Sequence, residues 1–266
     1  MQRRLSEEGT SSQDPEYIYG YEQYTNILHR LQLRTGSKLR IRIASHRFKS
    51  GSVWAPLPGN RLCFSGGFTQ TLTSNELVSI VPVKDFVVLS KSQMISARLN
   101  HAVAFTKEFL YAIGGFNMVG AIAECERYSI HDDQWVPLPP LPTADYGITA
   151  VILETTQRIY VLGGGVGGIN AIHALSLKEE VWTTLGCELP DEARNIAAFI
   201  ESSRVYFILR ASLYALDIDG SQTQLVKVET SCFQCYFGPT YYSKGSVYAS
   251  FHGGEPKQLW IGSLAR

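Results

Sequence analysis

Short runs of apolar residues alternate with glycine- and proline-rich turns along most of this chain. Residues 101–105 form one such run, and 109–115, 125–130 and 134–136 follow it, with the turn residues 131–133 before the last. These runs have the length of β-strands, and no apolar residues between them recur at the 3.6-residue spacing of an amphipathic helix. The pattern therefore predicts an all-β protein whose local unit has four strands.

The four-stranded unit recurs along the chain. Three runs end in the glycine pairs Gly66-Gly67, Gly114-Gly115 and Gly163-Gly164, and the first glycines of these pairs are 48 and 49 residues apart. Gly253-Gly254 ends a later copy, Arg210-Ala211 replaces the glycines in the copy before it, and residues 17–20 form a degenerate first copy. The sequence thus contains six copies at intervals of 43 to 49 residues, which indicates a repeat architecture.

A tryptophan stands on the predicted fourth strand of the two best copies. Trp135 follows Tyr128 by seven residues, and Trp182 follows Leu175 by the same interval. Such a sheet cannot bury both faces alone, and radial stacking of several sheets solves this problem in a β-propeller. The diglycine after the second strand, with the aromatic residue and the tryptophan that follow, resembles the kelch motif. The resemblance covers residues 16–264 and implies a kelch-type β-propeller.

The repeat leaves the number of blades open. We expect a disordered polar tail over residues 1–15 and a propeller of four-stranded antiparallel sheets over residues 16–266. The first copy lacks an innermost strand and the last lacks a fourth, so six blades with imperfect closure are preferred. The alternative is a five-bladed ring whose last sheet is completed, by strand exchange, by residues 38–43.

Motifs that would indicate catalysis or a cofactor have structural explanations here. Residues 163–168 satisfy G-x-G-x-x-G, but a dinucleotide site requires a helix to begin there, and residues 169–177 have β character. Cys232 and Cys235 form a single C-x-x-C, and the other three cysteines are isolated, which favours neither a zinc site nor a redox site. We expect no catalytic residues, no cofactor and no metal.

Charge is balanced in total but uneven along the chain. The 24 basic and 24 acidic residues sum to zero, which argues against binding to nucleic acid. Residues 23–75 contain no acidic residue, whereas residues 108–154 contain seven and one arginine. In residues 38–43 the basic residues alternate with aliphatic ones, as on a half-buried outer strand whose charges prevent edge-to-edge pairing. A docking patch for an acidic partner is the alternative for this segment.

Location can be predicted from what the sequence lacks. No apolar run is long enough to cross a bilayer. An odd number of scattered cysteines fits reduced thiols. We therefore expect a protein of the cytoplasm, or of the nucleus, that does not bind membranes.

Binding residues follow from the kelch resemblance, which implies that a partner docks on the face carrying the loops around the central channel. Arg98, Arg194 and Arg210 are the preferred candidates, as bidentate donors to a carboxylate or a phosphorylated partner. Arg98 and Arg194 could instead tie neighbouring blades together. The other candidates are Arg47, Tyr146, Phe116, Asn117, Asn195 and Tyr236.

The function that the sequence favours is a non-enzymatic protein-interaction module, acting as a substrate-recognition subunit or a scaffold. Because about 15 residues precede the first copy, a role in a ubiquitin ligase would require a separate ligase subunit or a longer protein. One alternative is a small-molecule isomerase or oxidase on the same propeller, which convergent carboxylates or histidines in the channel would favour. Another is a cytoskeletal scaffold.

Overall fold

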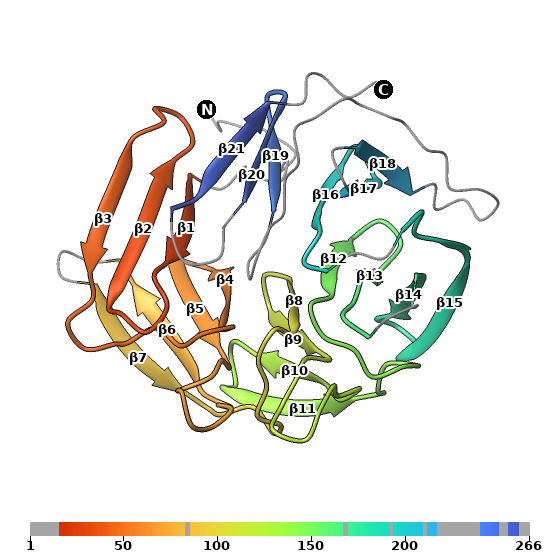
Figure 1. The fold of residues 1–266 in the computed structure, drawn as a ribbon, viewed down its shortest axis with the longest axis horizontal. Helices are drawn as coiled ribbons and strands as arrows, with labels where there is room; N and C mark the ends of the chain where they lie inside the picture. Colours follow the sequence, from red (N-terminus) through yellow and green to blue (C-terminus); the bar gives the residue numbers. More distant parts are fainter. Residues whose placement is uncertain are drawn as a thin grey trace, which may run out of the picture.

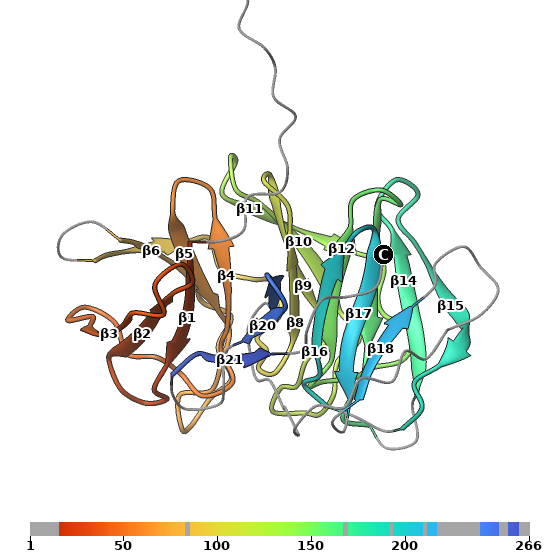
Figure 2. The same ribbon diagram turned by 90° about the horizontal axis from the view of Figure 1, so that it is seen from above.

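Every regular element that the computed structural model describes is a β-strand, as the sequence predicts. The described residues are 16–82, 86–166, 170–191, 194–209, 212–216, 240–249 and 255–260. Their strands form six antiparallel sheets around a common centre (Figure 1). Seen edge-on, the strands run between two faces on which the connecting loops gather (Figure 2). The structure is a kelch-type propeller of antiparallel sheets, as expected.

Three sheets have four strands, and the chain forms each of them in order from the centre outward. The second sheet contains β4 (Val53–Leu57), β5 (Arg61–Ser65), β6 (Leu77–Val81) and β7 (Val87–Lys91). The third contains β8 (Ala102–Phe105), β9 (Phe109–Ile113), β10 (Cys125–Ser129) and β11 (Gln134–Leu138). The fourth contains β12 (Thr149–Leu153), β13 (Arg158–Leu162), β14 (Ala171–Ser176) and β15 (Val181–Glu188).

The other three sheets have three described strands each. The first contains β1 (Tyr17–Tyr21), β2 (Ile27–Gln32) and β3 (Lys38–Arg42). The fifth contains β16 (Ala197–Glu201), β17 (Arg204–Leu209) and β18 (Ser212–Leu216), and the sixth contains β19 (Tyr241–Ser243), β20 (Ser246–Ala249) and β21 (Lys257–Trp260). Since β3 pairs with β2, placing Arg40 opposite His29, the described part of residues 38–43 belongs to the first sheet rather than to the last.

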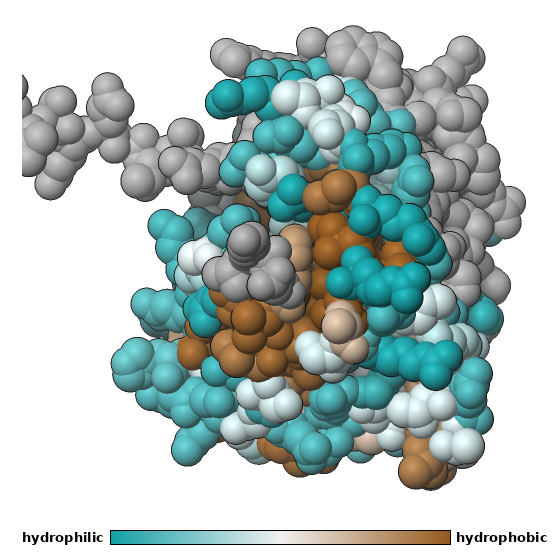
Figure 3. Space-filling view, turned by 90° about the vertical axis from the view of Figure 1, so that its left-hand side faces the viewer, coloured by the Kyte–Doolittle hydropathy of each residue, from teal (hydrophilic) through white to brown (hydrophobic). Residues whose placement is uncertain are grey.

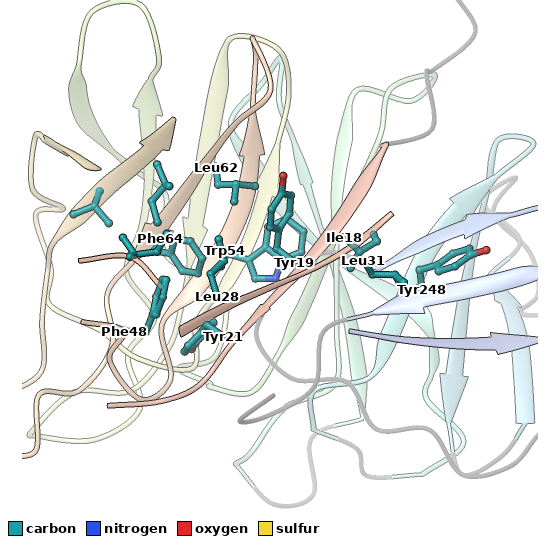
Figure 4. Packing of buried hydrophobic residues seen from close by; sticks show 13 residues of the cluster. Ile18, Tyr19, Tyr21, Leu28, Leu31, Phe48, Trp54, Leu62, Phe64 and Tyr248 are labelled. Atoms are coloured by element: carbon teal, nitrogen blue, oxygen red, sulfur yellow. The ribbon is translucent and has the colours of Figure 1, made fainter. Parts of the chain in front are cut away.

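The first sheet packs against both of its neighbours and closes the ring. Against the second sheet, the ring of Phe48 lies 5.3 Å from that of Tyr21 and 4.8 Å from that of Phe64 (Figure 4). On the other side, Tyr248 of β20 lies beside Ile18 in the same buried cluster (Figure 4). The apolar faces that no single sheet can bury alone are thus buried between sheets.

The kelch tryptophans join neighbouring sheets. Tyr128 and Trp135 are directly opposite each other on β10 and β11, with ring centroids 5.1 Å apart. The indole N–H of Trp135 donates to the carbonyl oxygen of Ser92, which follows the last strand of the preceding sheet. Trp182 repeats this bond with the carbonyl oxygen of Pro139. The seven-residue interval in the sequence is therefore a cross-strand pair, and its tryptophan anchors the third and the fourth sheet to the sheet before it.

Two of the three basic residues of β3 have acidic partners within the chain. Lys38 pairs with Glu255 at 2.8 Å, and Arg40 pairs with Glu22 at 3.2 Å. Hydrophobic side chains also gather on this side of the molecule, which carries β3 and β7 (Figure 3), and Leu39 is among the exposed residues of β3. Two of the three charges on this strand are thus already compensated, so an acidic docking patch here is not favoured.

Candidate functional site

The loops that follow the diglycines and those that connect the sheets emerge on one face, which we call the loop face. A series of backbone hydrogen bonds fixes it. The N–H of Asn100 donates to Gly51 O, that of Gly147 to Asn100 O, and that of Asn195 to Gly147 O, at 3.0, 2.8 and 2.6 Å. These four residues precede β4, β8, β12 and β16, and all have positive φ. The starts of four innermost strands are therefore linked around the channel.

Arg98 is bonded entirely within the propeller. Its side chain has no exposed surface, and its Nη2 donates to Glu126 at 2.5 Å. Its Nη1 donates to the carbonyl oxygens of Gly114 and Glu124, both at 2.7 Å. Glu126 in turn accepts the backbone N–H of Ile95. This corrects the expectation that Arg98 contacts a partner, because a buried guanidinium with these bonds cannot reach one; it ties the second sheet to the third.

Three other predicted residues come together on the loop face: Phe116 from the loop between β9 and β10, Tyr146 from the connection between β11 and β12, and Arg194 from the connection between β15 and β16. The guanidinium carbon of Arg194 lies 5.3 Å from the ring centroid of Tyr146. The ring of Tyr146 meets that of Phe116 edge-on, with centroids 5.1 Å apart. Arg194 is exposed, and its Nη2 donates to Gly165 O at 2.6 Å. We call Phe116, Tyr146 and Arg194 the loop-face trio.

The loop beside Phe116 presents apolar side chains that the sequence analysis did not select. Asn117 Oδ1 accepts the N–H groups of Val119 and Gly120, at 2.8 and 3.2 Å, and this closes a tight turn. The turn leaves Met118 64% exposed and Val119 96% exposed. Asn117 therefore shapes the loop. Two adjacent apolar residues between an asparagine and a glycine were the sequence signal for this exposed tip.

Two further predicted residues in the described part of the chain, Arg47 and Asn195, do not belong to the trio. Arg47 is exposed in the connection between the first and second sheets, and its Nε donates to Tyr24 O at 2.6 Å. Asn195 contributes its backbone to the hydrogen bonds around the channel. Arg210 and Tyr236 lie outside the described residues, as do Gly253 and Gly254.

A one-residue offset separates the buried from the exposed candidates. Arg98 and Asp145 stand two residues before the positive-φ residues Asn100 and Gly147, and both are buried. The carboxylate of Asp145 accepts the N–H of Gly165 at 2.8 Å, so it also binds the next sheet and is not part of the exposed face. Tyr146 and Arg194 each stand one residue before the positive-φ residue. Neighbouring side chains of an extended segment point to opposite sides, which explains the difference.

The glycine pairs lie where neighbouring backbones approach each other. Gly66, Gly67, Gly114, Gly115 and Gly163 have positive φ. At Gly115, with φ of 113°, a Cβ would lie 2.9 Å from Leu99 O and from the Cβ of His101. At Gly164 the Asp145 carboxylate occupies the space of a Cβ. The element after the glycine-rich segment is β14, a strand, so the helix that a dinucleotide fingerprint requires does not follow it.

The innermost strands surround a cavity of about 550 Å³. Glu154 and Glu201 line it at the ends of β12 and β16, whereas His101 lines it at the start of β8. Burial and the nearby Arg98 charge hold the pKa of His101 well below its usual range, so its imidazole is neutral. Within the described residues, no group of three or more His, Cys, Asp or Glu side chains could hold a metal ion. His101 thus lies at the opposite end of the cavity from Glu154 and Glu201.

The repeats can be compared with known proteins. A family model for the Kelch motif matches residues 97–142, the segment that contains Arg98, the second glycine pair and Trp135. Kelch-like protein 7 of Rattus norvegicus is 33% identical to this chain over 91 residues. Kelch repeat and BTB domain-containing protein 2 of Cowpox virus (strain Brighton Red) is 25% identical over 142 residues. The chain carries a Kelch motif and is similar to kelch-repeat proteins over part of its length.

The matches cover part of each kelch protein. The alignment with Kelch-like protein 7 spans 34% of this chain and 15% of that protein, and the alignment with the viral protein spans 52% and 25%. Kelch-like protein 35 of Mus musculus is 28% identical over 131 residues, which is 47% of this kelch chain and 22% of that protein. In the described part of the kelch propeller, no helix is long and apolar enough to cross a membrane.

Proposed function

We propose that this kelch propeller is a non-enzymatic protein-interaction module that binds its partner on the loop face, with the loop-face trio at the centre of the contact. The observation that carries the proposal is the cation–π contact of Arg194 with Tyr146 together with the edge-on contact of Tyr146 with Phe116. Aromatic residues and arginine dominate the energetic centres of protein interfaces. The trio provides both on one continuous surface.

The charge of Arg194 defines one part of the partner. The contact with the Tyr146 ring restricts the conformations of the Arg194 side chain before binding. Less conformational entropy is therefore lost when a partner binds. Among the described residues, its Nη2 donates to Gly165 O, and a guanidinium carries five N–H donors. A carboxylate or phosphate of the partner is the complementary group for the remaining donors.

The apolar tip defines the other part. Phe116 is 37% exposed, and Met118 and Val119 beside it are more exposed still. Apolar side chains that are already partly ordered by a turn lose little freedom when a partner covers them. We therefore propose that the partner segment carries an acidic or phosphorylated residue close to an apolar one.

Selection from a displayed random peptide library tests the proposal directly. The expected result is enrichment of peptides in which Asp or Glu lies near an aliphatic or aromatic residue. Arg194→Ala and Phe116→Ala should each lower the affinity for the selected peptides at least tenfold, since truncation of a hot-spot residue costs about 2 kcal/mol or more of binding free energy. Val181→Ala, on the exposed outer strand β15, is the matched control. Unchanged affinity in both trio variants would contradict the proposal.

A role as the substrate-recognition subunit of a ubiquitin ligase is the finer part of this proposal. Its support is that similar proteins carry kelch repeats together with a BTB domain, as their names state. The test is the cellular half-life of a partner identified through the selected peptides. If the partner is recruited for degradation, Arg194→Ala lengthens its half-life, whereas an unchanged half-life leaves a scaffold role.

A further inference from the structure

The outermost strand of the second sheet, β7, has an open edge. It pairs with β6, from Leu77 opposite Lys91 to Val81 opposite Val87, and with no other described strand. Among the described residues, no other segment forms a backbone hydrogen bond with the five residues of β7. Neighbouring residues of a strand direct their N–H and C=O groups to opposite edges. Every second residue of β7 therefore presents an unpaired donor and acceptor outward.

Three other outermost strands have features that discourage pairing, and β7 lacks them. β3 carries three basic residues, β11 contains Pro137, and β15 pairs with β14 through a register shift. Charged residues, proline and bulges are the usual means by which an edge strand is protected from a further strand. The single charge of β7 is Lys91 at its end, and this side chain pairs with Asp133. The edge of β7 is therefore the least protected of these four.

Apolar side chains flank this edge on both faces of β7. On one face, Val87 and Leu89 are 45% and 42% exposed. On the other face, Val88 packs against the buried cluster between the first and second sheets, as Ile41 of β3 does, and both are partly exposed. Leu39 of β3 is 47% exposed, and Figure 3 shows hydrophobic side chains gathered on this side of the molecule. A strand added to β7 would gain apolar contacts as well as backbone hydrogen bonds.

The two sheets around this edge are basic. Residues 17–91 contain ten basic and three acidic residues. The carboxylates of this segment that the structure describes, Glu22 and Glu76, are already in ion pairs. Arg34 and Arg61 form no ion pair within the described ranges. Two copies of this chain meeting at β7 would bring two basic regions together, so repulsion disfavours a second copy. An acidic segment is the complementary partner.

We propose that the outer edge of β7 binds an extended segment of a partner protein by strand addition, and that this segment has aliphatic residues at alternate positions and acidic residues at its ends. At about 3.4 Å per residue, the five residues of β7 span roughly 17 Å. The ion pairs of Lys38 and Arg40 stay in place, because alternation puts these side chains on the face of β3 opposite Leu39. The site does not include the loop-face trio, so it stands or falls independently of the proposed function.

Synthetic peptides test the strand addition. The parent peptide has seven residues and capped ends, with aspartate at both termini, valine at the second, fourth and sixth positions and threonine between them. Isothermal titration should show that it binds the whole chain, and failure to bind at millimolar concentration overturns the proposal. A version with lysine at both termini should bind at least tenfold more weakly, since like charges repel. Equal affinity of the two versions overturns the acidic character of the partner.

Two N-methylated versions of the parent peptide test the backbone contact. Methylation of the three valine amides blocks one edge of the peptide and leaves the other edge free, whereas methylation of the third, fourth and fifth amides blocks both edges. The first version should keep its affinity, and the second should lose at least tenfold. Because the number of methyl groups is the same, equal affinity of the two versions overturns strand addition.

Variants assign the contact to β7. Leu89→Asp removes an apolar contact and repels the acidic parent peptide, so it should lower the affinity at least tenfold. Val136→Asp is the matched control, because Val136 is 40% exposed on β11, the outermost strand of the third sheet. Both side chains are exposed, so both variants should fold, which the circular dichroism spectrum checks. Equal loss of affinity in the two variants overturns the assignment.

Two further measurements distinguish the other occupants and sites. Hydrogen exchange of backbone amides should slow in β7 when the parent peptide binds, and slower exchange in residues 116–119 instead would place the peptide on the loop face and overturn the proposal. Sedimentation of the chain alone should show a monomer. A dimer that Leu89→Asp dissociates would show that a second copy occupies the edge, which also overturns the proposal.

Discussion

The backbone N–H of Asn100 donates to the carbonyl oxygen of Gly51 at 3.0 Å, and this bond joins the start of the third sheet to the start of the second. Asn100 has φ of 50°, a left-handed conformation that asparagine tolerates better than most residues. The same bond recurs between Gly147 and Asn100 and between Asn195 and Gly147. The spacing of the innermost strands around the channel therefore depends on a few residues with positive φ.

Asn100→Val should destabilise the propeller, because a β-branched residue is strained in the left-handed conformation. The expected loss is about 1–3 kcal/mol in the free energy of unfolding, measured by urea denaturation. Asn100→Gly is the control, since glycine adopts this φ without strain. If valine and glycine proved equally stable, φ at this position would not be the constraint.

Gly115→Val should also destabilise by about 1–3 kcal/mol through backbone strain, and the added carbon would press on Leu99 O and His101. Gly186→Ala provides the contrast, because a Cβ there meets nothing within 4 Å. Thermal unfolding should show a lower melting temperature for Gly115→Val and an unchanged melting temperature for Gly186→Ala. An unchanged melting temperature for Gly115→Val would refute its packing role.

Arg98→Ala should cost much more stability than Arg194→Ala, although both remove a predicted binding arginine. Truncation of Arg98 leaves Glu126 buried without its partner, and breaking such a pair costs about 3–5 kcal/mol. Arg194 is exposed, so its loss should change the free energy of unfolding by less than about 1 kcal/mol. Chemical denaturation of the two variants side by side makes the comparison. Similar losses would show that the buried ion pair contributes no more than a surface contact.

Titration of Asp133 should make the stability of the fold depend on pH in the acid range. Partial burial works against its ionised form, but the N–H of Ser92, the hydroxyl of Tyr128 and the charge of Lys91 outweigh this and hold its pKa below the usual range. Because the folded-state pKa of Asp133 is lowered, its ionised carboxylate stabilises the fold above the unfolded pKa of about 3.9. This stabilisation is lost as pH falls through the folded-state pKa.

Asp133→Asn tests this dependence, and asparagine also tolerates the positive φ of this position. Urea denaturation should show a loss at pH 7 of less than about 1 kcal/mol, because the carboxylate is partly exposed. The difference from the unchanged protein should shrink toward pH 3. A difference that stays constant with pH would show that the charge of Asp133 is not involved.

Much of the fold could be predicted because each copy of the repeat has the same local pattern of strands and turns. The interval between Tyr128 and Trp135 recurs between Leu175 and Trp182, and both intervals are cross-strand pairs. The candidate site was only partly predictable, since burial of a side chain depends on which side of an extended segment it occupies. Aligning the arginines on Asn100 and Asn195 would have separated Arg98 from Arg194, because the first stands one residue further away.

The sequence by itself determined the all-β class, the six-copy repeat and the positions of the glycine pairs, because strand length, turn residues and backbone freedom are local properties. Only the tertiary structure decided that Arg98 is an internal tie, that Tyr146 contacts both Phe116 and Arg194, and that Glu154 and His101 lie at opposite ends of one cavity. These relations join different sheets, and radial packing brings together side chains that are far apart along the chain.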